Sequence, residues 1–289
     1  MWYYRLPGAA SARLVVDTSD GVYDLSTARD AICGYEDLAV AADIAGEPID
    51  ELTRRLIADA DRLVGNESLA NPLTPVVPEE VWACGVTYEI SEQAREAESG
   101  MPEIYLDVYD NDRPEIFFKA TPSRTVGPGE AVGIRGDSTW DVPEPELALV
   151  LYDGEIVGYT IGNDMSSRDI EGTNPLYLPQ AKVYDRCAAI GPAIASPSVV
   201  EDPHDLEMTL EIHRDGETVV TDATSTAEMA RTCEELVDTY RKHNVVPDFA
   251  VLMTGTALVP PDDFTLADGD VVKITIEDIG TLENDVVTV

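Results

Sequence analysis

The stretch DVPEPELALVLYDGEIVGYTIGND, residues 141–164, carries the strongest structural signal in the chain. Two apolar runs flank the turn pair Asp153-Gly154, which is the pattern of a β-hairpin. Glu144 and Glu146 precede the first run at a spacing of two, so both carboxylates face one side of an extended strand. Asp164 ends the second strand, and pairing of the two strands brings it beside the glutamates.

Three carboxylates with room for water suit a hard divalent cation such as Mg²⁺ or Mn²⁺. The sequence has no His or Cys cluster for zinc, no glycine-rich phosphate loop and no G-x-S-x-G nucleophile motif. Two other interpretations stay open: Glu144 and Glu146 form a solvated strand end, and Asp164 caps the following turn.

Acidic residues dominate the charge, with 56 Asp and Glu against 19 Lys and Arg in 289 residues, a net charge of −37. Such a surface repels nucleic acids and anionic membranes, and it is typical of a protein adapted to a salty cytoplasm. No apolar run reaches the length of a membrane span, and no secretion signal is evident. We therefore expect a cytoplasmic protein with no nucleic-acid or membrane partner. A non-enzymatic, acid-rich protein that binds cations at its surface stays open as an alternative.

Outward from the hairpin, the chain is rich in strands and indicates an α+β fold. A second hairpin is expected over residues 205–223, around Asp215-Gly216, and helices over 36–65, 90–98 and 226–242. Pro72, Pro75 and Pro78 interrupt the pattern and indicate a linker. We predict a small N-terminal α+β domain, residues 1–72, followed by a catalytic domain, residues 73–289.

Lysine is scarce, with only four residues in the chain. Lys119 in IFFKATPS and Lys182 in LPQAKVYD have weakly charged neighbours in the sequence. A desolvated lysine is a candidate acid or base, because burial lowers its pKa. The alternative for each is an ion pair with one of the many carboxylates.

These segments together resemble the fumarylacetoacetate hydrolase family over about residues 80–280. The resemblance rests on an ordered set of motifs: GVTY (85–88), FKATPS (118–123), EPELA (144–148), GYT (158–160), NDMSSRD (163–169), Lys182, Gly191-Pro192 and TGT (254–256). It implies a mixed β-roll and a Mg²⁺ site, with Mn²⁺ as an alternative, formed by Glu144, Glu146 and Asp164. It also implies that Lys182 lies beside the metal and that Thr256 contacts the substrate carboxylate.

Hydrolytic members of the family carry a water-activating His at the position of Ser91, and Thr87 replaces their Asn. Longer strings around residues 113–122 and 174–180 instead resemble the branch that dehydrates 2-keto-3-deoxypentonates, the small sugar acids formed from xylose or arabinose. This branch implies Lys182 as base, Glu115 as acid, and substrate contacts from Lys119 and Phe118. It also implies a homo-oligomer, a dimer or a tetramer. Acylpyruvate hydrolysis and oxaloacetate decarboxylation by the same family site stay open as alternatives.

Overall fold

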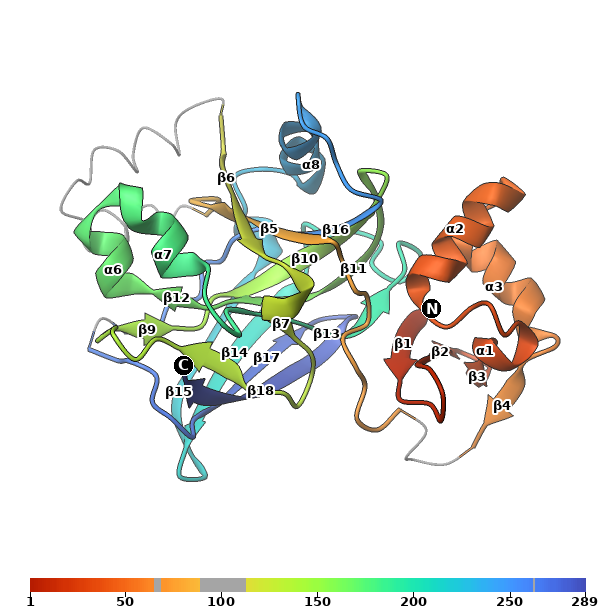
Figure 1. Cartoon of the computed structure of the whole chain (residues 1–289), viewed down its shortest axis with the longest axis horizontal. Coiled ribbons are helices and arrows are strands. Elements are labelled where there is room, and N and C mark those ends of the chain that lie inside the picture. Colours follow the sequence, from red (N-terminus) through yellow and green to blue (C-terminus); the bar gives the residue numbers. More distant parts are fainter. Residues whose placement is uncertain (65–68, 89–112, 262) are drawn as a thin grey trace.

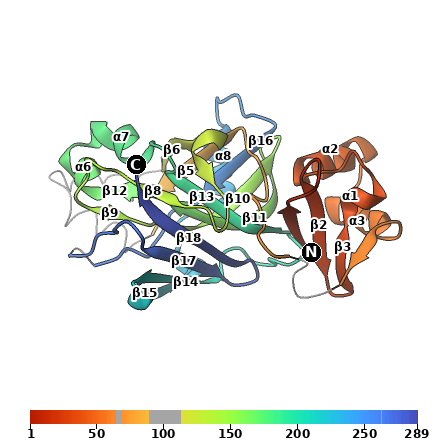
Figure 2. The same ribbon diagram turned by 60° about the horizontal axis from the view of Figure 1, so that its bottom comes forward.

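The computed structural model describes residues 1–64, 69–88, 113–261 and 263–289. Within these ranges the chain forms two packed sheets with few helices, shown from two sides in Figures 1 and 2. Most neighbouring strands are antiparallel, while three pairs are parallel. The fold is therefore sheet-dominated and mixed, as predicted. The predicted helix over residues 90–98 lies outside the described residues.

The larger sheet contains eleven of the described strands. Across the sheet its main path runs β4 (Asp61–Leu63), β3 (Gly21–Asp24), β2 (Arg13–Thr18), β1 (Trp2–Leu6), β13 (Ala188–Ala195), β11 (Glu155–Asp164), β10 (Pro145–Tyr152), β16 (Phe249–Met253), β5 (Glu80–Gly85) and β6 (Glu115–Ala120), and β7 (Thr125–Val126) pairs with β13. Most of the motifs quoted from the sequence thus lie on, or directly after, the neighbouring strands from β13 to β6.

A five-stranded sheet packs beneath the larger one, as the rotated view in Figure 2 shows. In order it contains β15 (Glu217–Ser225), β14 (Glu207–Arg214), β17 (Val271–Ile276), β18 (Gly280–Thr288) and β8 (Val132–Ile134). Strands β9 (Asp141–Val142) and β12 (Ser166–Ser167) form a separate short pair. Buried apolar residues of both sheets belong to one continuous core.

Both predicted hairpins are confirmed. Strands β10 and β11 pair antiparallel through Asp153-Gly154, and β14 and β15 pair through Asp215-Gly216. All four turn residues have positive φ angles, which is the requirement that favours Asp-Gly in two-residue turns.

The N-terminal strands extend the larger sheet, because β1 pairs antiparallel with β13. In Figure 1 they form a lobe at the right with three helices: α1 (Leu25–Ala28), α2 (Tyr35–Ala45) and α3 (Ile49–Ile57). The expected helix over residues 36–65 is thus wrong in part. Gly46 adopts a left-handed conformation and ends α2, Pro48 caps the start of α3, and residues 61–63 form a strand. The domain division at residues 72 and 73 stays a prediction.

The helix predicted over residues 226–242 is shorter in the structure. Residues Thr226–Glu228 form the 3₁₀ turn η3, and the α-helix α8 covers only Cys233–Arg241. Two short helices were not expected from the sequence, namely α6 (Arg168–Thr173) and α7 (Leu178–Lys182). They are joined by the 3₁₀ turn η2 (Pro175–Tyr177) and lie at the left of Figure 1. A further 3₁₀ turn, η1 (Pro122–Arg124), follows β6.

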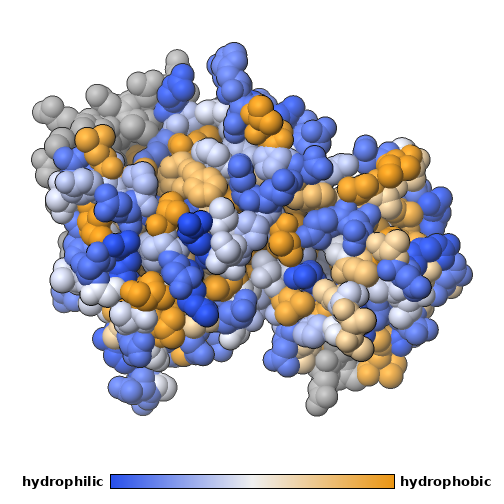
Figure 3. All heavy atoms as spheres, in the orientation of Figure 1, coloured by the Kyte–Doolittle hydropathy of each residue, from blue (hydrophilic) through white to orange (hydrophobic). Residues whose placement is uncertain are grey.

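Hydrophilic residues cover most of the face shown in Figure 3, with apolar residues in small groups between them. Among the described residues, no helix is both long and apolar enough to cross a bilayer.

Candidate active site

The three predicted carboxylates meet in one buried cluster at the end of the β10–β11 hairpin. Register places Glu146 opposite Gly162, and the backbone N–H of Asp164 donates to the carbonyl of Glu144 at 2.9 Å. One carboxylate oxygen from each of Glu144, Glu146 and Asp164 lies within 4.8 Å of the others. The hairpin geometry expected from the sequence therefore does bring these three side chains together.

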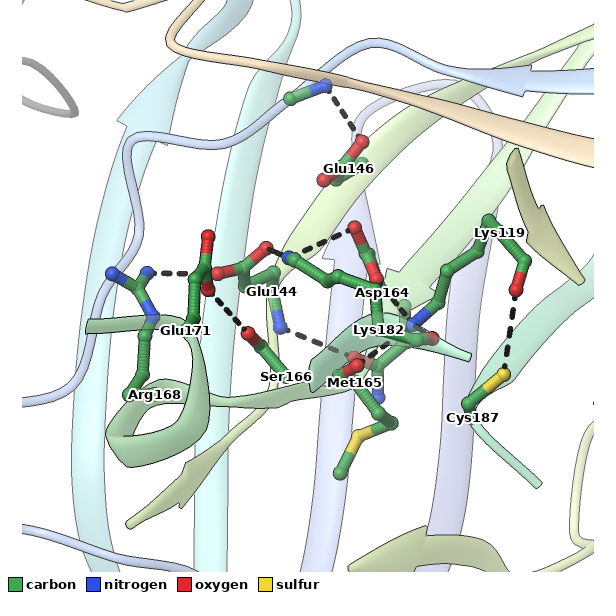
Figure 4. Close-up of polar contacts among 12 residues, drawn as sticks. Lys119, Glu144, Glu146, Asp164, Met165, Ser166, Arg168, Glu171, Lys182 and Cys187 are labelled. Carbon is green, nitrogen blue, oxygen red and sulfur yellow. Dashed lines mark hydrogen bonds and ion pairs between the residues drawn. The ribbon is translucent and has the colours of Figure 1, made fainter. Parts of the chain in front are cut away.

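Lys182 lies between two of these carboxylates, as Figure 4 shows. Its Nζ forms an ion pair with Glu144 Oε2 and another with Asp164 Oδ2 at 3.0 Å, and the side chain is fully buried. The residue ends α7, and Pro179 in the first turn favours this short helix. A lysine brought in by a separate helix thus offsets part of the negative charge in the cluster.

Arg168 approaches the cluster from the opposite side and was not predicted as a site residue. Its guanidinium lies 2.8 Å from Glu144 Oε1, and both side chains are buried. Nearby, the hydroxyl of Ser166 donates to Glu171 at 3.0 Å, which joins the short strand β12 to α6. Arg168 belongs to the same NDMSSRD motif as Asp164, four residues further along the chain. This proximity in the sequence is the one feature that could have indicated Arg168 as a site residue.

The loop that follows β16 contacts the side chain of Glu146. The backbone N–H of Gly255 donates to Glu146 Oε2 at 2.6 Å. Burial raises the pKa of the Glu146 carboxyl well above its ordinary value, and the negative charges of Asp164 and Glu144 raise it further. A divalent cation among these oxygens would remove that repulsion, so the donor set fits a metal such as Mg²⁺.

Thr256 follows directly in this loop, and its hydroxyl accepts the N–H of Leu258 at 3.0 Å. Gly255 has a φ of +90°, and a Cβ there would lie 2.0 Å from the hydroxyl oxygen of Thr87. Only glycine fits this close approach. The GVTY and TGT motifs are therefore packed together, which holds Thr256 next to the carboxylate cluster.

Glu115 begins β6 and lies opposite Gly85 of β5. A Cβ on Gly85 would be 2.0 Å from Glu115 Oε2, so the missing side chain leaves room for the carboxylate. Burial, followed by the charges of Glu146 and Glu115, raises the pKa of the Cys84 thiol. Alternation along β6 places Glu115 on the same face of the strand as Lys119, whose Nζ pairs with Asp164. Ser91 lies outside the described residues.

Alternation along β6 separates the two phenylalanines of IFFKA. Phe118 packs edge-on against Trp82, with ring centroids 5.7 Å apart, and Trp82 in turn contacts Tyr240 of α8. Phe117 points the other way, and the Nζ of Lys182 lies 5.5 Å from its ring centroid. The structure thus places Phe117, which the sequence did not single out, beside the cluster, and Phe118 on the other face of β6 against Trp82. Counting the strand parity from Lys119 would have distinguished them.

Lys119 shares the site face of β6 with Phe117. Its Nζ lies 2.6 Å from Asp164 Oδ1 and donates to the carbonyl of Met165 at 2.7 Å and to the carbonyl of Lys182. The side chain is fully buried. All of the predicted metal ligands and both lysines therefore belong to one connected set of charges.

The model of the fumarylacetoacetate hydrolase C-terminal family matches residues 80–287, most of the chain. The chain belongs to the fumarylacetoacetate hydrolase family, as its motifs indicated.

Two curated proteins and one solved structure are similar to this chain over most of its length. A protein of Haloferax volcanii described as a probable 2-keto-3-deoxyxylonate dehydratase is 57% identical over 289 residues, 100% of both chains. The 2-dehydro-3-deoxy-D-arabinonate dehydratase of Saccharolobus solfataricus is 48% identical over 214 residues, 72% of each protein. A solved structure of 2-keto-3-deoxy-D-arabinonate dehydratase complexed with magnesium and 2,5-dioxopentanoate superposes with a TM-score of 0.85 at 36% identity. That match covers 100% of this chain and 99% of the other.

Proposed function

We propose that this chain is a magnesium-dependent dehydratase of 2-keto-3-deoxypentonates that forms 2,5-dioxopentanoate. The main support is the buried cluster of Glu144, Glu146 and Asp164 together with Lys182. The cluster lies in a chain that is 57% identical over its full length to the Haloferax protein. The solved relative with magnesium and 2,5-dioxopentanoate supports the same metal and product.

The charges around the cluster support an anionic substrate. Three carboxylates face three cationic side chains, those of Lys119, Lys182 and Arg168. A bound divalent cation would add positive charge beside these groups and can take the carboxylate and ketone oxygens of a 2-keto acid as further ligands. When bound, Mg²⁺ supplies a Lewis acid that withdraws electrons from the substrate ketone. Mn²⁺ has similar ligand preferences and is expected to substitute for it.

Lys182 is our candidate for the base that removes a proton from C3. Its Nζ lies between two of the proposed metal ligands, next to any keto acid held there. Beside a divalent cation bound by these carboxylates, the ammonium form of Lys182 would be disfavoured, which leaves the neutral amine that can accept the C3 proton. Phe117 covers one side of the amine and limits the access of water. Loss of the C3 proton places the electron pair where it can expel the hydroxyl at C4.

Glu115 is our candidate for the acid that protonates this leaving hydroxyl, so that it departs as water. The resulting C3–C4 double bond moves to C4–C5 when C5 loses a proton and C3 regains one. The C5 enol then becomes the aldehyde, and the net change is the loss of one water. Thr256, next to the Glu146-bound Gly255, is proposed to hold the substrate carboxylate.

The decisive experiment offers 2-keto-3-deoxyxylonate and 2-keto-3-deoxyarabinonate to the purified protein with Mg²⁺. We expect 2,5-dioxopentanoate, identified by mass spectrometry after derivatisation of its aldehyde. Oxaloacetate and an acylpyruvate are assayed in parallel. Turnover of either of these, without dehydration of the pentonates, would replace the proposal with decarboxylation or hydrolysis.

We further propose a cytoplasmic homo-oligomer, a dimer or a tetramer. The charge of −37 supports a salty intracellular medium over a nucleic-acid or membrane surface. Light scattering in molar KCl measures the mass, and a monomer would contradict the oligomer.

A further inference from the structure

The ammonium of Lys119 is surrounded on all sides by protein groups. An ion pair with Asp164 Oδ1 at 2.6 Å and hydrogen bonds to the carbonyls of Met165 and Lys182 engage it. The Tyr184 ring lies beside it, with its centroid 5.7 Å from Nζ. A lysine ammonium has three N–H groups, and here two carbonyls and a carboxylate stand against them. Little capacity is left for a substrate oxygen.

These acceptors belong to the two segments on which the site depends. Asp164 ends β11 and Met165 follows it directly, whereas Lys182 ends α7. One cation on β6 therefore ties a proposed metal ligand to the helix end that carries the proposed base (Figure 4). Because buried carbonyls and carboxylates are costly to leave without partners, removing this cation would loosen both segments together.

We propose that Lys119 is a positioning residue that orients Asp164 and Lys182, and not the substrate contact that the family resemblance implied. The proposal rests on the proposed function for the identity of the base and the metal site. The orientation of Asp164 is nevertheless measurable through metal binding alone, without any turnover.

The first test compares Lys119→Met with Lys273→Met, a matched control that removes a lysine from the ion pair with Glu211 on the smaller sheet. Mn²⁺ affinity is measured by electron paramagnetic resonance titration. We expect Lys119→Met to bind Mn²⁺ about 10–100-fold more weakly, the usual effect of removing a group that orients a ligand. At saturating metal, kcat should fall while KM for the pentonate changes little. Wild-type Mn²⁺ affinity combined with a raised KM would overturn the proposal.

The second test uses the wild-type chain, so it stands even where Lys119→Met does not fold. The chain has only four lysines, which makes selective ¹⁵N labelling of their ammonium groups tractable. Lys182→Met, Lys242→Arg and Lys273→Arg assign the remaining signal to Lys119 by elimination. We expect its protons to exchange slowly with water and its signal to stay in place when 2-oxobutyrate is added in the presence of Mg²⁺.

A Lys119 signal that shifts with 2-oxobutyrate as far as the Lys182 signal would make Lys119 a substrate contact and end the proposal. A protein that dehydrates no pentonate but loses Mn²⁺ affinity in Lys119→Met would contradict the proposed function and leave the positioning role supported. The positioning role of Lys119 and the proposed dehydratase function can therefore be contradicted independently of each other.

Discussion

The Nζ of Lys182 lies 3.0 Å from Oδ2 of Asp164, although one residue ends a helix and the other ends a strand. Both side chains are buried, so neither charge is balanced by water. Each group stabilises the other, and removing one leaves an uncompensated buried charge. This pair connects the proposed base directly with the proposed metal site.

Lys182→Met should remove turnover while the fold remains. The substitution keeps the length of the side chain but deletes the amine, so kcat for the pentonate should fall about 10²–10⁴-fold, as expected for loss of a general base. Mn²⁺ binding should persist, because no proposed metal ligand is deleted. Steady-state assays and Mn²⁺ titration check both points. Deuterium exchange at C3 of 2-oxobutyrate should fall with kcat, and exchange at the wild-type rate would assign the base elsewhere.

Removal of divalent metal should abolish activity, because the cluster supplies only oxygen ligands. Dialysis against EDTA should leave less than about a hundredth of the turnover, and Mg²⁺ or Mn²⁺ should restore it. Loss of a group that only orients a ligand weakens metal binding by up to about 100-fold. Glu146→Gln removes a proposed ligand itself, so it should weaken Mn²⁺ binding by more than this. Glu217→Gln, on the exposed strand β15, is the control for the loss of a carboxylate. Full turnover after chelation would exclude the proposed metal site.

Phe117 and Phe118 should differ in what they affect. Phe117→Ala opens the surroundings of the Lys182 amine, so kcat should fall several-fold, and because Phe117 packs against the hydrophobic core the free energy of unfolding should fall as well. Phe118→Ala removes the edge-on contact between two half-buried rings, so the free energy of unfolding should fall by about 1 kcal/mol while kcat stays near the wild-type value. Urea denaturation and steady-state kinetics on both variants separate the effects. The reverse pattern would mean that the parity of β6 is misassigned.

Asp141 should make stability depend on pH. Burial raises the pKa of its carboxyl from the ordinary 3.8 to about 6. Between pH 6 and 4 the folded chain therefore binds a proton that the unfolded chain does not, and this group adds stability as the pH falls. Above pH 6 the ionised carboxylate costs stability. Asp141→Asn should thus be more stable than wild type at pH 7.5, and the difference should shrink towards pH 4. Parallel thermal melts measure it, and a difference independent of pH would contradict the assignment.

Molar salt should stabilise the folded chain. A net charge of −37 produces self-repulsion, which salt screens as the Debye length falls to about 3 Å at 1 M. The melting temperature should rise steadily from dilute to molar KCl, measured with EDTA present so that metal binding does not contribute. A flat curve would indicate that local ion pairs already balance the surface charge.

The sequence by itself determined the elements whose signals are local. Asp153-Gly154 and Asp215-Gly216 specify their turns because two-residue hairpins need positive φ angles. The spacing of Glu144 and Glu146, with Asp164 at the end of the paired strand, was sufficient to predict the carboxylate cluster. By contrast, the helix predicted over residues 36–65 ran too far, because its apolar spacing continued past Gly46 and Pro48, whose backbone preferences interrupt it.

The family resemblance placed Lys182 beside these carboxylates, but only the tertiary structure showed that Lys119 and Arg168 meet them as well. Lys119, Lys182 and Arg168 reach the cluster from β6, α7 and α6, and no local periodicity encodes contacts between such distant segments. Phe117 and Phe118 are adjacent, chemically identical and both half-buried, so only the direction of each side chain, towards Lys182 or towards Trp82, separates them. The ligand set follows from hairpin pairing, whereas the groups that orient it follow from how separate elements pack around one buried charge.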